Sequence, residues 1–120
     1  MIARTAVILA AFAIASAPSA ARAQNNAAAV AAEMERGEAV FTYWCATCHA
    51  AGPGMPGTQA LQVKYNGALP ALLTQRTDLT PELIAFYVRN GVSVMPFFRK
   101  TEISDADLDA LADYMVSSAR

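Results

Sequence analysis

Both cysteines of the chain and its only histidine lie within five consecutive residues. The segment is Cys45-Ala46-Thr47-Cys48-His49, in which two thiols three positions apart are followed at once by an imidazole. C-x-x-C-H is the spacing at which two cysteines attach one haem covalently while the histidine ligates its iron. The segment therefore predicts one haem c, held by Cys45 and Cys48, with His49 as an axial ligand.

Three other kinds of site are compatible with parts of this segment. A thioredoxin-like C-x-x-C requires a βαβ context, and the sequence has no strand pattern. A structural zinc site needs four Cys or His ligands, whereas this chain has three such residues. A disulfide between Cys45 and Cys48 would close a very short loop and would stabilise the fold little. We therefore prefer the haem interpretation.

The second axial position decides what the iron can do, and Met95 is the predicted ligand there. The chain has no second histidine, so two histidine ligands from this chain are excluded. Met95 follows a helix stop, precedes a proline and is distant enough in sequence to reach the opposite face of the haem. Met34, Met55 and Met115 are placed less favourably for that task. Histidine and methionine together raise the reduction potential and leave no open iron site, so we expect one-electron transfer; a haem enzyme or gas sensor with an open iron is the less favoured alternative.

Further residues are candidates for the surroundings of the haem. The second nitrogen of a ligating histidine needs a hydrogen-bond acceptor, and for His49 we expect the backbone carbonyl of Pro56, or else that of Pro53. Tyr65 and Arg76 are candidate donors to the haem propionates.

Three basic residues flank Met95, namely Arg89, Arg99 and Lys100. They could surround an exposed haem edge and steer a partner, they could contact the propionates, or they could simply be a solvated loop edge. The sequence leaves these alternatives open.

The first 23 residues match a secretory signal peptide. Arg4 supplies a positive charge, residues 6–15 are an unbroken apolar run, and residues 21–23 form an A-x-A cleavage site. A run of ten residues is too short to span a membrane, and an N-terminal helix is the alternative interpretation. We expect a signal peptide over 1–23, a cytochrome domain over 24–120 and export to the periplasm. The sequence has no stripe of basic residues of the kind that indicates nucleic-acid binding. Its net charge is −1.

The sequence predicts an all-α fold of three or four short helices, with long loops wrapped around the haem. In the first half, residues 24–32 are expected to be a loosely ordered lead-in, with the fraying start of a helix as the alternative. A helix is expected over about 33–46, and Gly37 interrupts that run. Three glycines and two prolines lie close together after the motif, so residues 50–69 are expected to be a loop. A short helix is expected over 70–75.

In the second half, two helices carry clear start signals. Thr80 followed by proline predicts a helix start, and Gly91 is the expected stop. Ser104 is the predicted N-cap of the last helix. Apolar side chains with helical spacing then follow in that helix: Leu108, Leu111, Ala112, Met115 and Val116.

On these residues the sequence resembles class I cytochromes c over nearly all of residues 24–120. In that family the first and last helices cross at a glycine and an aromatic contact. Gly37 and Phe41 lie eight and four residues before the first cysteine, as in the family pattern, and Leu111 and Tyr114 match the partner positions. The resemblance implies a cytochrome c fold in which these two helices cross.

Three segments are also similar to the cytochrome subunit of p-cresol methylhydroxylase-like flavocytochromes: residues 53–58, 76–91 and 95–114. This narrower resemblance implies a periplasmic cytochrome subunit that accepts electrons from a flavoprotein (FAD) dehydrogenase and passes them to a copper protein or another cytochrome. The alternative is a freestanding periplasmic carrier between respiratory complexes. An apolar surface at the haem edge would suit a stable subunit, and a charged one a transient carrier.

Overall fold

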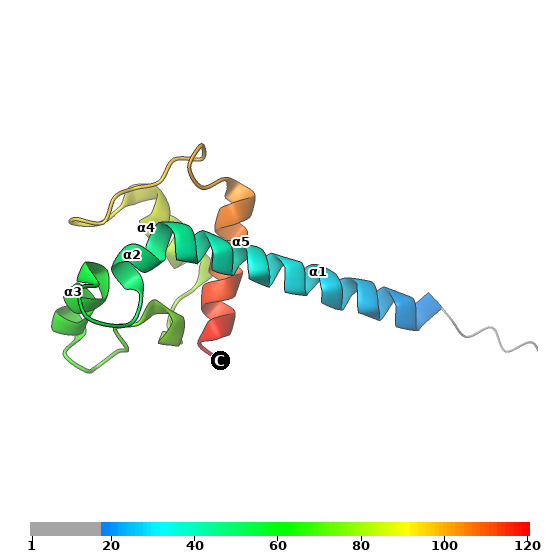
Figure 1. Ribbon diagram of the computed structural model, residues 1–120, viewed down its shortest axis with the longest axis horizontal. Helices are drawn as coiled ribbons and strands as arrows, with labels where there is room; N and C mark the ends of the chain where they lie inside the picture. The colour runs from blue at the N-terminus through cyan, green and yellow to red at the C-terminus, as the bar shows by residue number, and fades with distance from the viewer. Residues whose placement is uncertain (1–17) are drawn as a thin grey trace, which may run out of the picture.

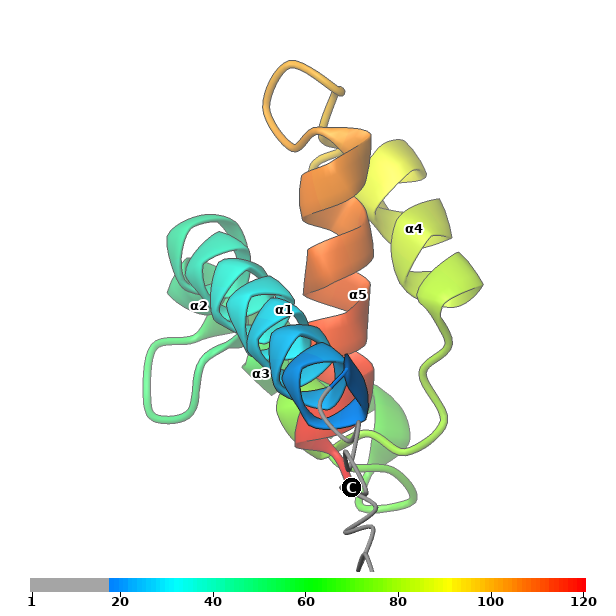
Figure 2. The same cartoon turned by 90° about the vertical axis from the view of Figure 1, so that its right-hand side faces the viewer.

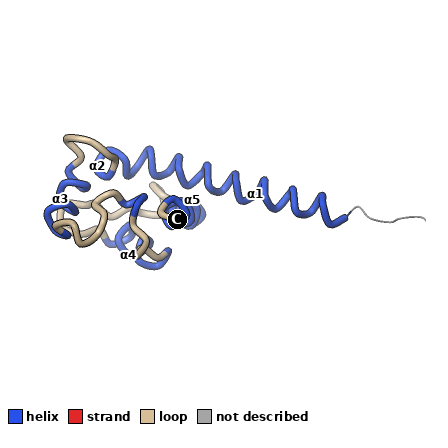
Figure 3. The backbone as a smooth tube through the Cα atoms, turned by 90° about the horizontal axis from the view of Figure 1, so that it is seen from below, coloured by secondary structure: helices blue, strands red, loops and turns tan. Residues whose placement is uncertain are grey.

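The computed structural model describes residues 18–120, and this part of the chain consists of helices and loops without a strand (Figures 1 and 3). Helix α1 (Pro18–Val40) is the longest element and continues through a π-helical turn, η1 (Phe41–Cys45), into α2 (Ala46–His49). The predicted all-α fold is therefore confirmed. The expected lead-in over 24–32 is wrong, because the alanines that fill it have the highest helix propensity of any residue.

The predicted signal peptide falls mostly outside the described residues. Residues 1–17 are not described, and residues 18–23 belong to the first turns of α1. The expected cleavage site after Ala23 thus lies within a helix whose residues 21–33 are all exposed. The signal peptide over 1–23 stays a prediction. Among the described residues, none of the helices combines the length and the apolar character that a membrane crossing requires.

Helix α3 (Pro56–Tyr65) occupies half of the segment that was expected to be a loop. Pro56 stands at the first helical position, where its fixed φ favours a helix start. Asn66 ends the helix in a left-handed conformation with φ 45°. The loop prediction for 50–69 is therefore wrong between these two residues, since the glycines and prolines mark the helix start rather than exclude a helix. The helix expected over 70–75 is reduced to one 3₁₀ turn, η2 (Leu73–Gln75).

Both capped helices predicted for the second half are present. Helix α4 (Pro81–Asn90) follows Thr80, whose hydroxyl oxygen accepts the backbone N–H three residues on at 3.3 Å. Helix α5 (Asp105–Ser118) follows Ser104, whose hydroxyl oxygen accepts the corresponding N–H at 3.1 Å. Gly91 ends α4 with φ 69°. The cap predictions are confirmed.

Helices α1 and α5 cross, as Figures 1 and 2 show. Gly37 lies where the two helices touch. A Cβ added to Gly37 would lie 2.1 Å from the carbonyl oxygen of Ala110 and 2.6 Å from Cβ of Tyr114. The rings of Phe41 and Tyr114 pack with centroids 5.8 Å apart. The expected crossing at a glycine and an aromatic contact is confirmed. Gly37 does not interrupt α1, which runs through it without a break, and the close approach of α5 is the physical reason for a glycine there.

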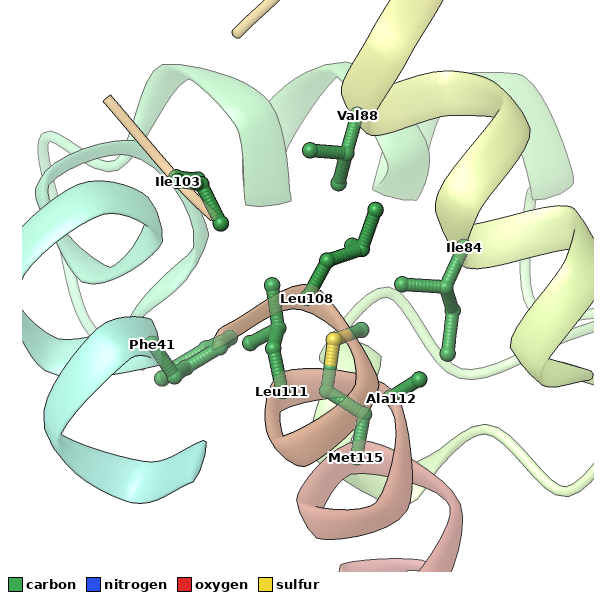
Figure 4. Packing of buried hydrophobic residues seen from close by; sticks show 8 residues of the cluster. All are labelled: Phe41, Ile84, Val88, Ile103, Leu108, Leu111, Ala112 and Met115. Atoms are coloured by element: carbon green, nitrogen blue, oxygen red, sulfur yellow. The ribbon is translucent and has the colours of Figure 1, made fainter. Parts of the chain in front are cut away.

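The hydrophobic core lies where α4 and the first residue of η1 pack against α5 (Figure 4). Eight buried apolar side chains form it: Phe41, Ile84, Val88, Ile103, Leu108, Leu111, Ala112 and Met115. Met115 is 4% exposed, so it fills the core, as the apolar stripe of the last helix indicated.

Candidate functional site

The haem-attachment segment lies at the C-terminal end of the α1–α2 run. Cys45 ends the π-helical turn, while Cys48 and His49 belong to the single turn of α2. Residues three apart in a helix share one face, so the two sulfurs are offered to the same side. Extra residues that widen a helical turn in this way are frequent at functional sites. Both cysteines are free thiols and half-buried, which is the state that thioether formation requires.

Burial sets the protonation of these groups. Desolvation, with a smaller contribution from Cys48, raises the pKa of the Cys45 thiol from 9.0 to about 11. Desolvation also lowers the pKa of His49 below its ordinary value of 6.5. The imidazole is therefore favoured in the neutral form, which is the form that ligates a metal.

His49 contacts the first turn of α3, and glycine makes this contact possible. A Cβ added to Gly57 would lie 2.7 Å from Cε1 and 2.9 Å from Nδ1 of His49. Nδ1 is buried and has no hydrogen-bond partner among the described residues. The predicted hydrogen bond to the carbonyl of Pro56, or that of Pro53, is thus not formed in the described part of the chain, where Pro56 is the first residue of α3.

Thr58 is a site residue that the sequence did not reveal. Its side chain is buried, and its hydroxyl donates to the carbonyl oxygen of Ala50 at 2.9 Å. This bond closes the loop between α2 and α3 and holds the start of α3 against His49. A threonine two positions after a proline at a helix start was the available signal.

Tyr65 and Arg76, the two candidate propionate donors, are brought together. The guanidinium of Arg76 lies over the Tyr65 ring, 4.5 Å from its centroid, although Tyr65 ends α3 and Arg76 follows η2. Arg76 is 5% exposed and donates to both carboxylate oxygens of Asp78, at 2.6 and 2.5 Å. Arg76 lowers the pKa of both the Tyr65 phenol and the Asp78 carboxyl. Asp78 was not predicted, because pairing with a buried arginine leaves no sequence pattern.

Met95 lies in the loop between α4 and α5, which we call the Met95 loop and define as residues 91–103. Its N–H donates to the carbonyl of Val92 at 2.9 Å, and its carbonyl accepts from the Val92 N–H at 3.1 Å. Trp44, next to the first cysteine, packs edge-on against Phe98 with ring centroids 5.6 Å apart. The loop is therefore in contact with the segment that carries the cysteines.

The three basic residues around Met95 are all paired with carboxylates. Arg89 contacts Asp105 at 3.0 Å, Lys100 contacts the same carboxylate at 2.6 Å, and Arg99 contacts a neighbouring glutamate. None of the three is thus an unpaired positive charge. Of the alternatives left open by the sequence, the solvated loop edge fits Arg99 and Lys100, whereas Arg89 is 21% exposed and also donates to two backbone carbonyls.

The rival interpretations of the motif find no support in the geometry. Among residues 18–120, no three or more side chains of histidine, cysteine, aspartate or glutamate gather in a metal-binding cluster. The two thiols are not joined in a disulfide. The free thiols, the buried Nδ1 and the closely packed Gly57 backbone suit covalent haem attachment.

Comparisons with known proteins agree with this site. A family model described as cytochrome C oxidase, cbb3-type, subunit III matches residues 32–115. Cytochrome c6 of Cyanidioschyzon merolae is 31% identical over 75% of this chain and 79% of its own. Cytochrome c6 of Bumilleriopsis filiformis is 33% identical over 73% of this chain and 94% of its own. No solved structure matches the chain.

The chain belongs to the class I c-type cytochromes. It is a monohaem electron-transfer protein, and its family implies one covalent haem c, for which Cys45 and Cys48 are available. The narrower resemblance to flavocytochrome subunits receives no support from these comparisons.

Proposed function

We propose that this cytochrome is a freestanding carrier that shuttles single electrons between respiratory complexes in the periplasm. The observation that carries the proposal is its match to cytochrome c6 chains over 79–94% of their length. The signal-peptide pattern of residues 1–23 supports export, with residues 24–120 as the mature domain.

In this proposal Cys45 and Cys48 would hold the haem through thioether bonds, and His49 and Met95 would ligate its iron. When bound, the haem supplies an iron that takes up and releases one electron. Two protein ligands leave no position for a substrate. The packing of Trp44 on Phe98 supports the assignment of Met95 as a ligand, because it holds the Met95 loop against the segment that carries the two cysteines.

The propionate side of the site is assigned to Tyr65 and Arg76. The guanidinium of Arg76 is buried and has five N–H donors, of which only some donate to Asp78. Remaining donors and the Tyr65 hydroxyl are then available to a carboxylate of the haem. Pro56 keeps only a packing role, as the start of α3.

A second candidate, the flavoprotein-bound subunit, has one observation in its favour. Apolar side chains beside Met95 are exposed: Val94 is 91% and Phe97 60% exposed. With the neighbouring basic residues neutralised, this surface is more apolar than charged. An apolar surface suits a lasting interface with a flavoprotein (FAD) dehydrogenase better than a transient encounter.

Met95→Ala in the mature holoprotein tests the ligand assignment. We expect loss of the methionine–iron charge-transfer band at the red edge of the ferric spectrum. We also expect the reduction potential to fall by on the order of 100 mV, because axial ligation sets haem potentials over about 0.8 V. Met34→Ala, a half-buried methionine on α1, is the control and should change neither property. An unaltered band and potential in Met95→Ala would show that another group is the ligand.

Purification from the native host separates the two candidate functions. A freestanding carrier is expected to elute as a monomer without flavin absorbance and to be oxidised by respiratory membranes. A stoichiometric flavoprotein that co-elutes, and that is released by Val94→Glu, would favour the subunit instead. Glu38→Gln, on the exposed face of α1, is the control and should leave elution unchanged.

A further inference from the structure

The side chain of Arg89 spans from the last turn of α4 to both ends of the segment that follows Met95. Its Nη1 donates to the carbonyl oxygens of Phe98 at 3.1 Å and Ile103 at 2.9 Å. Its Nη2 donates to a carboxylate oxygen of Asp105 at 3.0 Å. One guanidinium therefore bonds three acceptors on a loop and on the start of the next helix.

These acceptors enclose the part of the Met95 loop that has no regular structure. Phe98 lies three residues after Met95, Ile103 ends the loop, and Asp105 is the first residue of α5. The N–H of Phe98 also donates to the carbonyl of Val88 at 2.8 Å. Two successive residues of α4, Val88 and Arg89, thus hold the loop at Phe98, three residues after Met95.

Only an arginine can make this set of contacts. A guanidinium has five donors in a rigid plane, whereas a lysine ammonium is a single point with three. The side chain of Arg89 is 21% exposed, so water competes poorly for these donors, and hydrogen bonds from a charged donor are stronger than neutral ones. Without Arg89 the two carbonyls would lose the partner that orders the loop.

We propose that Arg89 is a positioning residue that keeps the Met95 loop closed, so that the methionine stays on the iron. The proposal rests on the ligation by Met95 proposed above. Arg89 does not touch the iron, and it acts by lowering the population of an open loop in which the sixth position is available to other ligands.

Imidazole binding to the ferric holoprotein measures that open population, because imidazole competes with the methionine for the iron. A larger open fraction tightens the apparent affinity in proportion. Arg89→Gln removes all three bonds, and Arg89→Lys keeps the charge and a contact with Asp105. We expect imidazole to bind at least tenfold more tightly to Arg89→Gln and at least threefold more tightly to Arg89→Lys, with a weaker methionine–iron band in both.

Two control variants separate this role from a general effect. Arg99→Gln removes the same charge from an exposed arginine that lies on the Met95 loop itself. Met115→Ala weakens the core at the far end of α5 and lowers the unfolding midpoint. The apparent imidazole affinity of both controls should stay within twofold of that of the unmodified protein. If Arg89→Gln does not fold, Arg89→Lys decides alone.

Two results would overturn the inference. The first is a change below threefold in a folded Arg89 variant, and the second is an equal gain of affinity in either control. If Met95 is not a ligand at all, the unmodified protein itself will have a ferric spectrum without the methionine–iron band. That outcome would refute ligation by Met95 and the positioning role together.

Discussion

The imidazole of His49 is held in place by a residue that has no side chain. The backbone of Gly57 passes so close that an added Cβ would lie 2.7 Å from Cε1 of His49 and 2.9 Å from the carbonyl oxygen of Cys48. The hydrogen bond from Thr58 to Ala50 keeps this backbone in place. The ring orientation is therefore fixed by packing on the α3 side, without a hydrogen bond at Nδ1.

Gly57→Ala is expected to disturb this arrangement. Because the new methyl group must displace either the imidazole or the start of α3, we expect a loss of about 1–3 kcal/mol in the free energy of unfolding. We also expect a shifted reduction potential, since the orientation of a ligand tunes its metal. Denaturant unfolding and redox titration of the holoprotein measure both. Gln59→Ala, an exposed change in the same helix, should alter neither; equal values for Gly57→Ala and the unmodified protein would refute the role of this contact.

Between elements, the crossing of α1 and α5 is the contact on which the fold depends most. These helices share more contacts than any other pair, and the crossing brings Gly37 against the backbone of Ala110. The π-helical turn that follows turns Phe41 toward α5, where it is 7% exposed and contacts Tyr114. The crossing thus sets the direction in which the attachment segment leaves α1.

Gly37→Ala tests the crossing. A Cβ there would lie 2.1 Å from a backbone carbonyl oxygen that cannot move without bending α5. We expect the free energy of unfolding to fall by about 3 kcal/mol, at the upper end of overpacking costs, although alanine is the better helix former by about 1 kcal/mol. Guanidinium unfolding followed by circular dichroism measures this. Glu38→Ala, one position along and exposed, should change the value by less than about 0.5 kcal/mol; a Gly37→Ala protein as stable as that control would contradict a close crossing.

At the scale of the whole molecule, the protein core covers only one part of the chain. All eight core side chains come from the start of η1, from α4 and from residues 103–115. Residues 50–72, which include α3, contribute no buried apolar side chain. This part of the chain must obtain its stability from something other than protein packing, and one covalent haem is the available apolar surface.

Removal of the haem is therefore expected to destabilise residues 50–72 more than the hydrophobic core. In a Cys45→Ala/Cys48→Ala protein without haem, backbone amides of residues 50–72 should lose most of their hydrogen-exchange protection. Amides near the crossing of α1 and α5 should keep more of theirs, because their apolar contacts are within the protein. Exchange followed by mass spectrometry compares the two forms. Full protection of α3 without haem would contradict this division of the molecule.

Acid should destabilise the molecule through its paired carboxylates. Hydrogen bonds from Arg76 and from Ser104 hold the pKa values of Asp78 and Asp107 below the ordinary 3.8. A carboxylate whose folded pKa is lowered stabilises the fold above the unfolded value, and this stabilisation is lost as the pH falls through the folded value. We expect a nearly constant contribution above pH 5 and a decline below 3.8. Thermal unfolding against pH checks this, and Asp78→Asn should show a shallower decline; an identical profile would refute the contribution of Asp78.

Sequence alone determined the features whose cause is local. The spacing of Cys45, Cys48 and His49 specifies one covalent haem because the chemistry acts over five consecutive residues. The capping residues Thr80 and Ser104 predicted the starts of α4 and α5, since a cap bonds an N–H only three residues away. The family pattern at Gly37 correctly placed the helix crossing.

Tertiary structure decided the features whose partners are distant in sequence. Three such features leave no periodic signal: the contact of Gly57 with His49, the group that Tyr65 and Asp78 form around the buried Arg76, and the fastening of the Met95 loop by Arg89. Each depends on the path of a whole segment, and that path follows from how helices pack around a core and a cofactor. A short motif can state which group the chain binds, but only the packed chain determines which residues hold that group in position.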